Sequence, residues 1–213
     1  MNEQQHLDTL TDIKRMMERS TRFISLSGLS GIIAGAAAIA GGAVAFVLIR
    51  DYYYQWDVLG NHSRQDFLHL KVKLMVLALA VLVIALTAGC YLTWRRARRN
   101  GEAIWDGVAR KVLVNLAIPL VAGGAFVMGS LYNEVPVLIA PVCLIFYGLA
   151  LVNASKYTLS DIRYLGLVEI ALGIVNLFAV RYGLYFWVLG FGVLHIVYGT
   201  SMWWKYERGT KVS

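Results

Sequence analysis

The chain of 213 residues is 58% hydrophobic and 15% charged, with a mean hydropathy of +0.59. A soluble domain normally carries about 25% charged residues, so this composition excludes an ordinary soluble protein and indicates an integral membrane protein. The net charge of +7 does not indicate nucleic acid as a partner, because most basic residues flank apolar runs, as they do in membrane proteins.

Residues 1–22 form a polar segment that precedes the first apolar run. Apolar residues recur in it at helical spacing, at Leu7, Leu10, Ile13 and Met17. This stripe predicts an amphipathic helix on the cytoplasmic membrane surface, and an arm that binds a partner is the alternative interpretation.

The first apolar run, residues 23–49, is long enough to cross a bilayer. The run and its charged leader both exceed the length of a signal peptide, so we expect a retained span. Small residues recur at intervals of three and four and share one helix face: Gly28, Gly31, Gly35, Ala38 and Gly42. Such a face lets another helix backbone come close, so these are the predicted helix-packing residues.

A connection is expected over residues 50–69, with the aromatic residues Tyr52, Tyr53, Tyr54 and Trp56 at the level of the lipid headgroups. Ser63 and Asp66 form a capping pattern that predicts a helix leading into the second span, about 70–94. On this helix His62, Asp66 and His69 share a face that, with Asp51, could hold a divalent metal. A solvated helix start explains the same residues, and no metal or cofactor is predicted.

A basic connection over residues 95–111 is followed by four further expected spans, at about 112–131, 135–153, 162–180 and 184–204. Pro119 is expected to interrupt the first of these four. Connections of three residues, 132–134 and 181–183, predict antiparallel hairpins. The predicted fold is therefore all-α, with six transmembrane helices in three hairpins over residues 23–204 and a polar cytoplasmic tail, 205–213.

The last two hairpins share a repeated pattern. Each has a glycine in the middle of its first helix, a Tyr-Gly pair in its second helix and a Lys-Tyr pair soon after it. The Tyr-Gly pairs are Tyr147-Gly148 and Tyr198-Gly199. This recurrence favours internal duplication of a helical hairpin.

The basic residues predict the orientation of the six spans. Fifteen lysines and arginines lie on the side that carries both termini, and five lie on the opposite side. By the positive-inside rule, this asymmetry places the N- and C-termini in the cytoplasm.

The segment YLGLVEIALGIVNLFAVRYGLYFWVLGFGVLHIVYG resembles the helical-hairpin repeat of the HdeD-type acid-resistance membrane proteins. The segment ERSTRFISLSGLSGI is similar to an uncharacterised family of small bacterial six-span proteins. These resemblances imply a multi-pass protein of the bacterial cytoplasmic (inner) membrane, and they supply no catalytic motif.

Polar residues inside the predicted spans are the candidate site. Glu169 lies about two turns into the fifth span, and His195 lies at a similar depth in the antiparallel sixth span. Further candidates for binding a ligand or a proton lie nearby in the spans: Tyr147, Tyr198, Asn115 and Asn176. A hydrogen bond that only ties the two helices together is the alternative interpretation of Glu169 and His195.

No H-E-x-x-H, G-x-S-x-G or phosphate-loop motif is present, so no enzyme activity is predicted. The small-residue face favours a non-enzymatic membrane component that associates with itself or with a partner. The alternative is a small solute or proton-linked transporter with a cytoplasm-facing pocket around Glu169 and His195. The expected partners are membrane lipids and further copies of the chain, as a homo-oligomer, and not nucleic acid.

Overall fold

The structure, a computed structural model, describes residues 27–59, 64–99, 101 and 105–208. Seven α-helices run through this part of the chain: α2 (Gly28–Leu59), α3 (Arg64–Arg99), α4 (Gly107–Tyr132), α5 (Ile139–Ala154), α6 (Asp161–Phe178), α7 (Gly183–Trp187) and α8 (His195–Tyr206). A π-helix, η4 (Val188–Leu194), joins α7 to α8. Three single 3-10 turns complete the helical segments: η1 (Pro136–Leu138), η2 (Ser155–Tyr157) and η3 (Val180–Tyr182). The predicted amphipathic segment 1–22 lies outside the described residues.

Five helical segments are long and apolar enough to cross a membrane: Gly28–Tyr54, Gln65–Arg99, Gly107–Tyr132, Pro136–Tyr157 and Val180–Tyr206. The expected fifth span corresponds to α6, which is not among them. Its 18 residues include the three charged residues Asp161, Arg163 and Glu169. The composition therefore indicates a membrane protein with at least five segments able to span.

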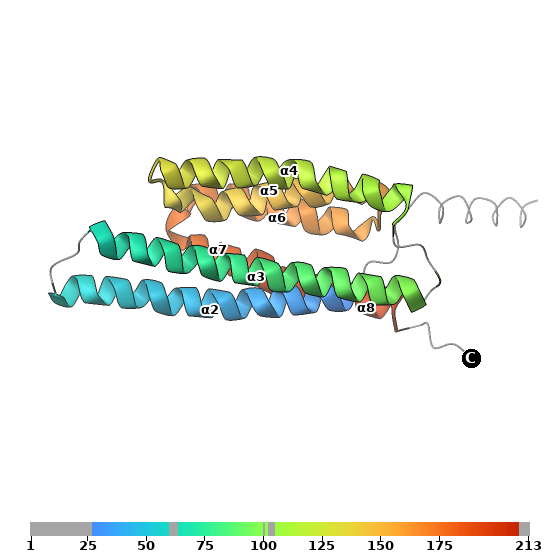
Figure 1. Ribbon diagram of the computed structural model, residues 1–213, viewed down its shortest axis with the longest axis horizontal. Helices are drawn as coiled ribbons and strands as arrows, with labels where there is room; N and C mark the ends of the chain where they lie inside the picture. The colour runs from blue at the N-terminus through green and yellow to red at the C-terminus, as the bar shows by residue number, and fades with distance from the viewer. Residues whose placement is uncertain (1–26, 60–63, 100, 102–104, 209–213) are drawn as a thin grey trace, which may run out of the picture.

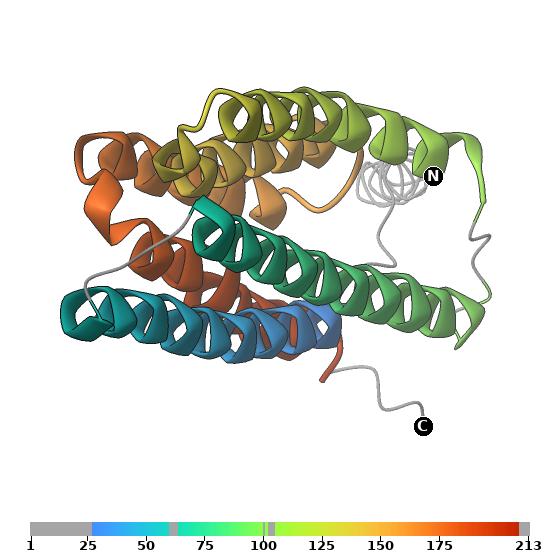
Figure 2. The ribbon, with the colours of Figure 1, turned by 60° about the vertical axis from the view of Figure 1, so that its left-hand side comes forward.

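The helices form two packed layers (Figure 1). One layer contains α4, α5 and α6, and the other contains α2 and α3 together with α7 and α8 (Figures 1 and 2). α2 begins and α8 ends at the same end of the bundle, which we call the terminal end; the turn between α4 and α5 lies at the opposite, distal end.

Two helices are longer than expected from the sequence. The expected connection 50–69 is largely helical, because α2 continues to Leu59 and α3 begins at Arg64. No glycine or proline occurs between Ala43 and Leu59 to end α2. The start of α3 agrees with the predicted capping pattern, although Ser63 itself lies outside the described residues.

Pro119 does not interrupt α4, which is continuous from Gly107 to Tyr132. A proline has no N–H to donate, so it leaves the carbonyl four residues earlier without its helical partner. That carbonyl belongs to Asn115, and it accepts a hydrogen bond of 2.9 Å from Asn153 Nδ2 in α5. A neighbouring helix thus satisfies the group that the proline frees, and α4 tolerates Pro119.

Glycines bring the helix backbones close together at two interfaces. Between α5 and α6, a Cβ on Gly148 would lie 2.5 Å from the carbonyl oxygen of Gly166. Between α8 and α2, a Cβ on Gly199 would lie 2.6 Å from the carbonyl oxygen of Gly28. Two turns further along α6 and α2, Gly173 faces the backbone of Pro141 and Ile145, and Gly35 faces the backbone of Gly192 and Ile196.

These two interfaces are equivalent residue by residue. Gly199, Gly192 and Ile196 of the α8 side follow Gly148, Pro141 and Ile145 of α5 at one constant interval of 51 residues. Gly166 and Gly173 of α6 follow Gly28 and Gly35 of α2 at one constant interval of 138 residues. The first interval also separates the two Tyr-Gly pairs of the sequence repeat, so the repeat corresponds to a duplicated helix–helix interface.

Apolar side chains from α5, α6, α8 and the turn before α6 pack together near the terminal end. We call the buried residues among them the terminal cluster: Leu151, Leu159, Ile162, Leu165 and Met202. Partly buried side chains that pack against it include three tyrosines, Tyr147, Tyr198 and Tyr206. This cluster lies between the polar candidate residues and the terminal end of the bundle.

Candidate functional site

Glu169 lies on the inward face of α6. The buried residues of this helix recur at intervals of three and four: Ile162, Leu165, Gly166, Glu169, Gly173 and Asn176. Gly166 and Gly173, one turn before and one turn after Glu169, allow the backbone of α5 to approach closely. The carboxyl group is consequently held at the centre of the bundle, and Glu169 is 0% exposed.

His195 is oriented by the π-helix. The carbonyl oxygen of Gly190 lies 3.0 Å from His195 Nδ1, and a carbonyl oxygen can only accept a hydrogen bond. Nδ1 therefore carries a proton, and in the neutral ring Nε2 is an acceptor. The hydroxyl of Tyr147 lies 2.8 Å from Nε2 and donates to it. Phe191 packs on both rings, with centroids 5.1 Å from Tyr147 and 6.0 Å from His195.

The carboxyl group of Glu169 lies beside this imidazole. Its Oε1 is 3.6 Å from His195 Nδ1, and neither carboxyl oxygen has a hydrogen-bond partner within the described part of the chain. A Cβ on Gly190 would lie 2.5 Å from Glu169 Oε2 and 2.5 Å from Leu144 Cδ2. The carboxyl group is thus tightly enclosed, and it has room only because residue 190 is glycine.

The structure brings three of the six candidate polar residues together, namely Glu169, His195 and Tyr147. Asn176 is fully buried two turns further along α6, where its Nδ2 donates to the carbonyl of Ala179 at 3.0 Å. Asn115 lies in α4, where its side chain donates to the carbonyl of Lys111 at 2.8 Å. Tyr198 lies one turn from His195 on α8, and its hydroxyl is buried without a hydrogen-bond partner among the described residues.

The small-residue face of α2 packs inside the same chain. Gly28 and Gly31 face Gly199, Gly35 faces Gly192 and Ile196, and Gly42 faces Val188. Ala38 is also buried, at 2% exposed. These residues therefore seat α8 and η4 on α2, and the face is not open to another molecule.

The metal site predicted near the start of α3 receives no support from the described residues. Within the described segments, no group of three or more His, Cys, Asp or Glu side chains is placed to hold a metal ion. His62 lies outside those segments, so the predicted set of His62, Asp66 and His69 stays a hypothesis.

Sequence reasoning missed a cluster at the terminal end that links α6 to α8. Asp161 accepts a hydrogen bond of 2.6 Å from the hydroxyl of Tyr206 and one of 2.9 Å from Lys205 Nζ. Desolvation by burial acts to raise the pKa of Asp161, but these hydrogen bonds and the charge of Lys205 outweigh it and hold the pKa below its usual value. The repeated Lys-Tyr pair was the only sequence signal for this cluster.

A second contact at the terminal end was also missed. Glu207 Oε1 accepts a hydrogen bond of 2.6 Å from the backbone N–H of Gly28, and it lies 3.2 Å from the guanidinium of Arg96. A carboxylate at the first turn of a helix satisfies a free N–H and complements the helix dipole. Glu207 therefore ties the end of α8 to the start of α2 and the end of α3.

Comparisons of this chain with protein-family models, with curated proteins and with solved structures gave no match.

Proposed function

We propose that this chain is a six-span membrane protein that binds a proton at Glu169 and His195 and uses it in proton-linked transport. One observation carries the proposal: a carboxyl group, 0% exposed and without a hydrogen-bond partner in the described structure, lies 3.6 Å from an oriented histidine. Ionisable residues inside a membrane bundle are costly, and they mark proton and ion pathways more often than packing sites.

The size of the enclosure favours a proton over a larger ligand. A methyl group added at Gly190 would overlap both Glu169 Oε2 and Leu144 Cδ2, so the space beside the carboxyl group is smaller than a methyl group. A metal cation needs several oxygen or nitrogen ligands around it, and Glu169 offers two oxygens with one neighbouring imidazole. A proton needs no such shell.

One proton satisfies the pair in either of two arrangements. At rest the proton sits on Glu169 beside a neutral imidazole; during transfer it sits on His195 beside a carboxylate at 3.6 Å. In both cases Nδ1 keeps its hydrogen bond to Gly190, because Nδ1 is protonated in the neutral and in the charged ring. The Tyr147 hydroxyl donates to the neutral ring and accepts from the charged ring, so the site holds its shape as the proton moves.

We include α6 among the six spans. Its 18 residues are about 27 Å long, close to the thickness of the hydrocarbon core. Asp161 and Arg163 lie in its first turn, and Glu169 faces inward, so its outer surface is apolar: Leu167, Val168, Ile174, Val175, Leu177 and Phe178 are exposed. By the positive-inside rule, the excess of lysine and arginine supports a cytoplasmic terminal end. The resemblances noted in the sequence support the bacterial inner membrane.

Self-association is a second candidate, and it now involves a different helix. α3 packs mainly on α2, and its apolar side chains are exposed along its length: Leu68, Val72, Val76, Leu79, Leu82, Val83 and Leu86. Lipid tails or a second copy of the chain would cover this surface. The resemblance to HdeD-type proteins supplies no catalytic motif, and it is compatible with this non-enzymatic alternative.

The proton-binding proposal is tested by infrared spectroscopy of the protein in lipid nanodiscs. A protonated carboxyl group has a C=O band that a carboxylate lacks. We expect such a band at neutral pH and its absence in Glu169→Gln. In proteoliposomes, Glu169→Gln should also abolish proton uptake driven by a potassium diffusion potential. A wild-type spectrum without a band assignable to Glu169, or unchanged proton uptake in Glu169→Gln, would overturn the proposal.

The six-span topology has its own test. In a background where Cys90 and Cys143 are replaced by alanine, single cysteines at the exposed positions Ser160 and Tyr182 would flank α6. A membrane-impermeant thiol reagent should label Tyr182→Cys from outside intact cells, and Ser160→Cys only after lysis. Labelling of both from the same side would remove α6 from the spans.

A further inference from the structure

Three tyrosines lie between the buried pair and the terminal end of the bundle. All three pack against the terminal cluster: Tyr147, Tyr198 and Tyr206. At the inner end, the Tyr147 hydroxyl is 2.8 Å from His195 Nε2. At the outer end, the Tyr206 hydroxyl donates to Asp161 Oδ2 at 2.6 Å. Both ends of this series therefore already bond to a titratable group.

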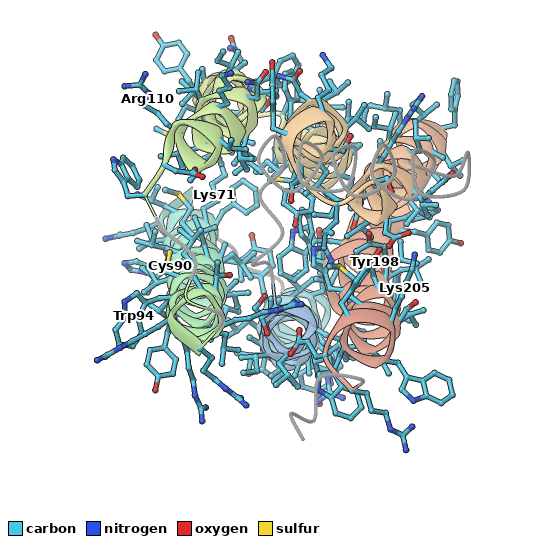
Figure 3. The ribbon with its side chains drawn as sticks, turned by 90° about the vertical axis from the view of Figure 1, so that its right-hand side faces the viewer. Lys71, Cys90, Trp94, Arg110, Tyr198 and Lys205 are labelled. Carbon is cyan, nitrogen blue, oxygen red and sulfur yellow. The ribbon has the colours of Figure 1, made fainter. Side chains whose placement is uncertain are left out.

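Tyr198 occupies the level between these two bonded groups. His195, Tyr198, Met202 and Tyr206 are spaced by three, four and four residues, so they share one face of α8. At 1.5 Å per residue, Tyr198 lies about 4.5 Å from the level of His195 and about 12 Å from that of Tyr206. Figure 3, viewed from the terminal end, places Tyr198 and Lys205 on the side of the bundle where α6 and α8 meet.

The hydroxyl of Tyr198 is polar, buried and without a hydrogen-bond partner among the described residues. Along α8, this hydroxyl lies between His195 and Tyr206, on the face that the three residues share. The Tyr198 side chain packs against the apolar terminal cluster. A buried unpaired hydroxyl in an apolar layer normally costs free energy, so this one calls for a reason.

We propose that Tyr206, Tyr198 and Tyr147 form the route by which protons pass between Asp161 at the terminal end and the Glu169–His195 pair. This inference rests on the proposed function. A hydroxyl both donates and accepts hydrogen bonds, so each tyrosine receives a proton on its oxygen as it passes its own proton onward. No tyrosine acquires a net charge, and no oxidant, reductant or other co-reactant is needed.

The two ends of the route have the chemistry that the transfer needs. Asp161 is a partly exposed carboxylate that takes a proton from water and passes it to the Tyr206 oxygen; Tyr206 and then Tyr198 hand on their own protons. Tyr147 delivers its proton to His195 Nε2, the ring nitrogen that lacks one. The imidazolium then passes its Nδ1 proton to Glu169 Oε1, 3.6 Å away. The ring is left neutral with its proton on Nε2, and the hydrogen bond to Gly190 forms again when the ring returns to the Nδ1-protonated tautomer.

Charged and titratable groups stand at both ends of the route: Asp161 from α6 and Lys205 from α8 at the mouth, and Glu169 and His195 at the inner end. Lys205 pairs with Asp161 at 2.9 Å, which favours the carboxylate as the resting form of the outer group.

Tyr198→Phe is the decisive variant because it removes only the hydroxyl. Since that hydroxyl makes no hydrogen bond, the variant should fold with unchanged or slightly higher stability. Tyr164→Phe is the matched control. It makes the same chemical change on α6, at a side chain that is 66% exposed.

The readout is the exchange of the Glu169 carboxyl proton for deuterium, followed by the shift of its C=O band after the buffer is changed to D2O. A positioned proton relay typically contributes about 100-fold or more to a transfer rate. We therefore expect exchange in Tyr198→Phe to slow by about that factor, and exchange in Tyr164→Phe to match the wild type.

Two results would overturn the proposed route while leaving proton binding intact. One is a Glu169 band that exchanges at the wild-type rate in Tyr198→Phe. The other is equal slowing in Tyr164→Phe, which would show a general effect on the bundle. Absence of a Glu169 band in the wild type would instead refute the proposed function, and the route with it.

Discussion

The two equivalent glycine interfaces predict that Gly148→Ala and Gly199→Ala destabilise the protein to a similar extent. The new Cβ of Gly148→Ala would lie 2.5 Å from the Gly166 carbonyl oxygen, and that of Gly199→Ala would lie 2.6 Å from the Gly28 carbonyl oxygen. Ordinary van der Waals contacts begin at 3.4 Å, so each helix pair would have to separate by about 1 Å. The obstructing atoms belong to backbone, which cannot rotate away.

Overpacking of this kind costs about 1–3 kcal/mol. For a chain of this length, each kcal/mol lowers the unfolding midpoint by about 2–4 °C. The control is Gly124→Ala in α4, where a Cβ would meet no atom within 4 Å. Alanine is the better helix former by about 1 kcal/mol, so the control should be neutral or slightly stabilised.

The assay is thermal unfolding of the purified variants in the same detergent, followed by circular dichroism. We expect midpoints for Gly148→Ala and Gly199→Ala about 2–12 °C below that of Gly124→Ala. If all three variants unfold at the same temperature, the close helix approach is wrong. If only one of the two interface variants is destabilised, the interfaces are not equivalent.

Three further outcomes follow from single contacts. Tyr147→Phe leaves His195 Nε2 buried without its hydroxyl donor and should cost about 1–3 kcal/mol in unfolding free energy, whereas Tyr198→Phe should cost nothing measurable. Glu207→Ala removes the acceptor for the Gly28 N–H and should lower stability by about 1–2 kcal/mol. Because the pKa of Asp161 lies below its usual value, the Asp161 contribution to stability is complete above about pH 4 and is lost as the pH falls through the folded value. An unfolding-midpoint profile from pH 6 to 2.5 should therefore show a smaller acid loss in Asp161→Asn than in the wild type, and identical profiles would contradict this assignment.

The proximity of Glu169 and His195 could be predicted from the sequence, because it required only the depth of each residue in the membrane. A charged residue in an apolar run is conspicuous, and the rise per residue along two antiparallel helices places both side chains at one level. The structure puts them 3.6 Å apart. The oriented tautomer of His195 was not accessible, since it depends on the π-helix that exposes the Gly190 carbonyl, and the run VLGFGVL has no periodicity that distinguishes a π-helix from an α-helix.

The partner of the small-residue face was also beyond the sequence. The spacing of Gly28, Gly31 and Gly35 predicts that some helix backbone comes close, but the pattern is the same whether that helix belongs to this chain or to another copy. Only the tertiary structure shows that α8 and η4 take this place. The observation that favoured self-association therefore accounts for internal packing.

The duplicated interface also bears on whether Glu169 serves packing or function. Equivalent positions in α2 and α6 are separated by 138 residues, so Glu169 in α6 is equivalent to Gly31 in α2. The α2–α8 interface reaches the same close backbone approach with a glycine there, beside the backbone of His195 and Gly199. This helix pair thus forms without an acid at that position, and an intramembrane carboxyl group costs about 2.5–3.5 kcal/mol on insertion scales. Glu169 is therefore not needed for close packing, because the equivalent α2–α8 interface packs as closely with a glycine in its place. Its cost is better explained by a proton that it binds.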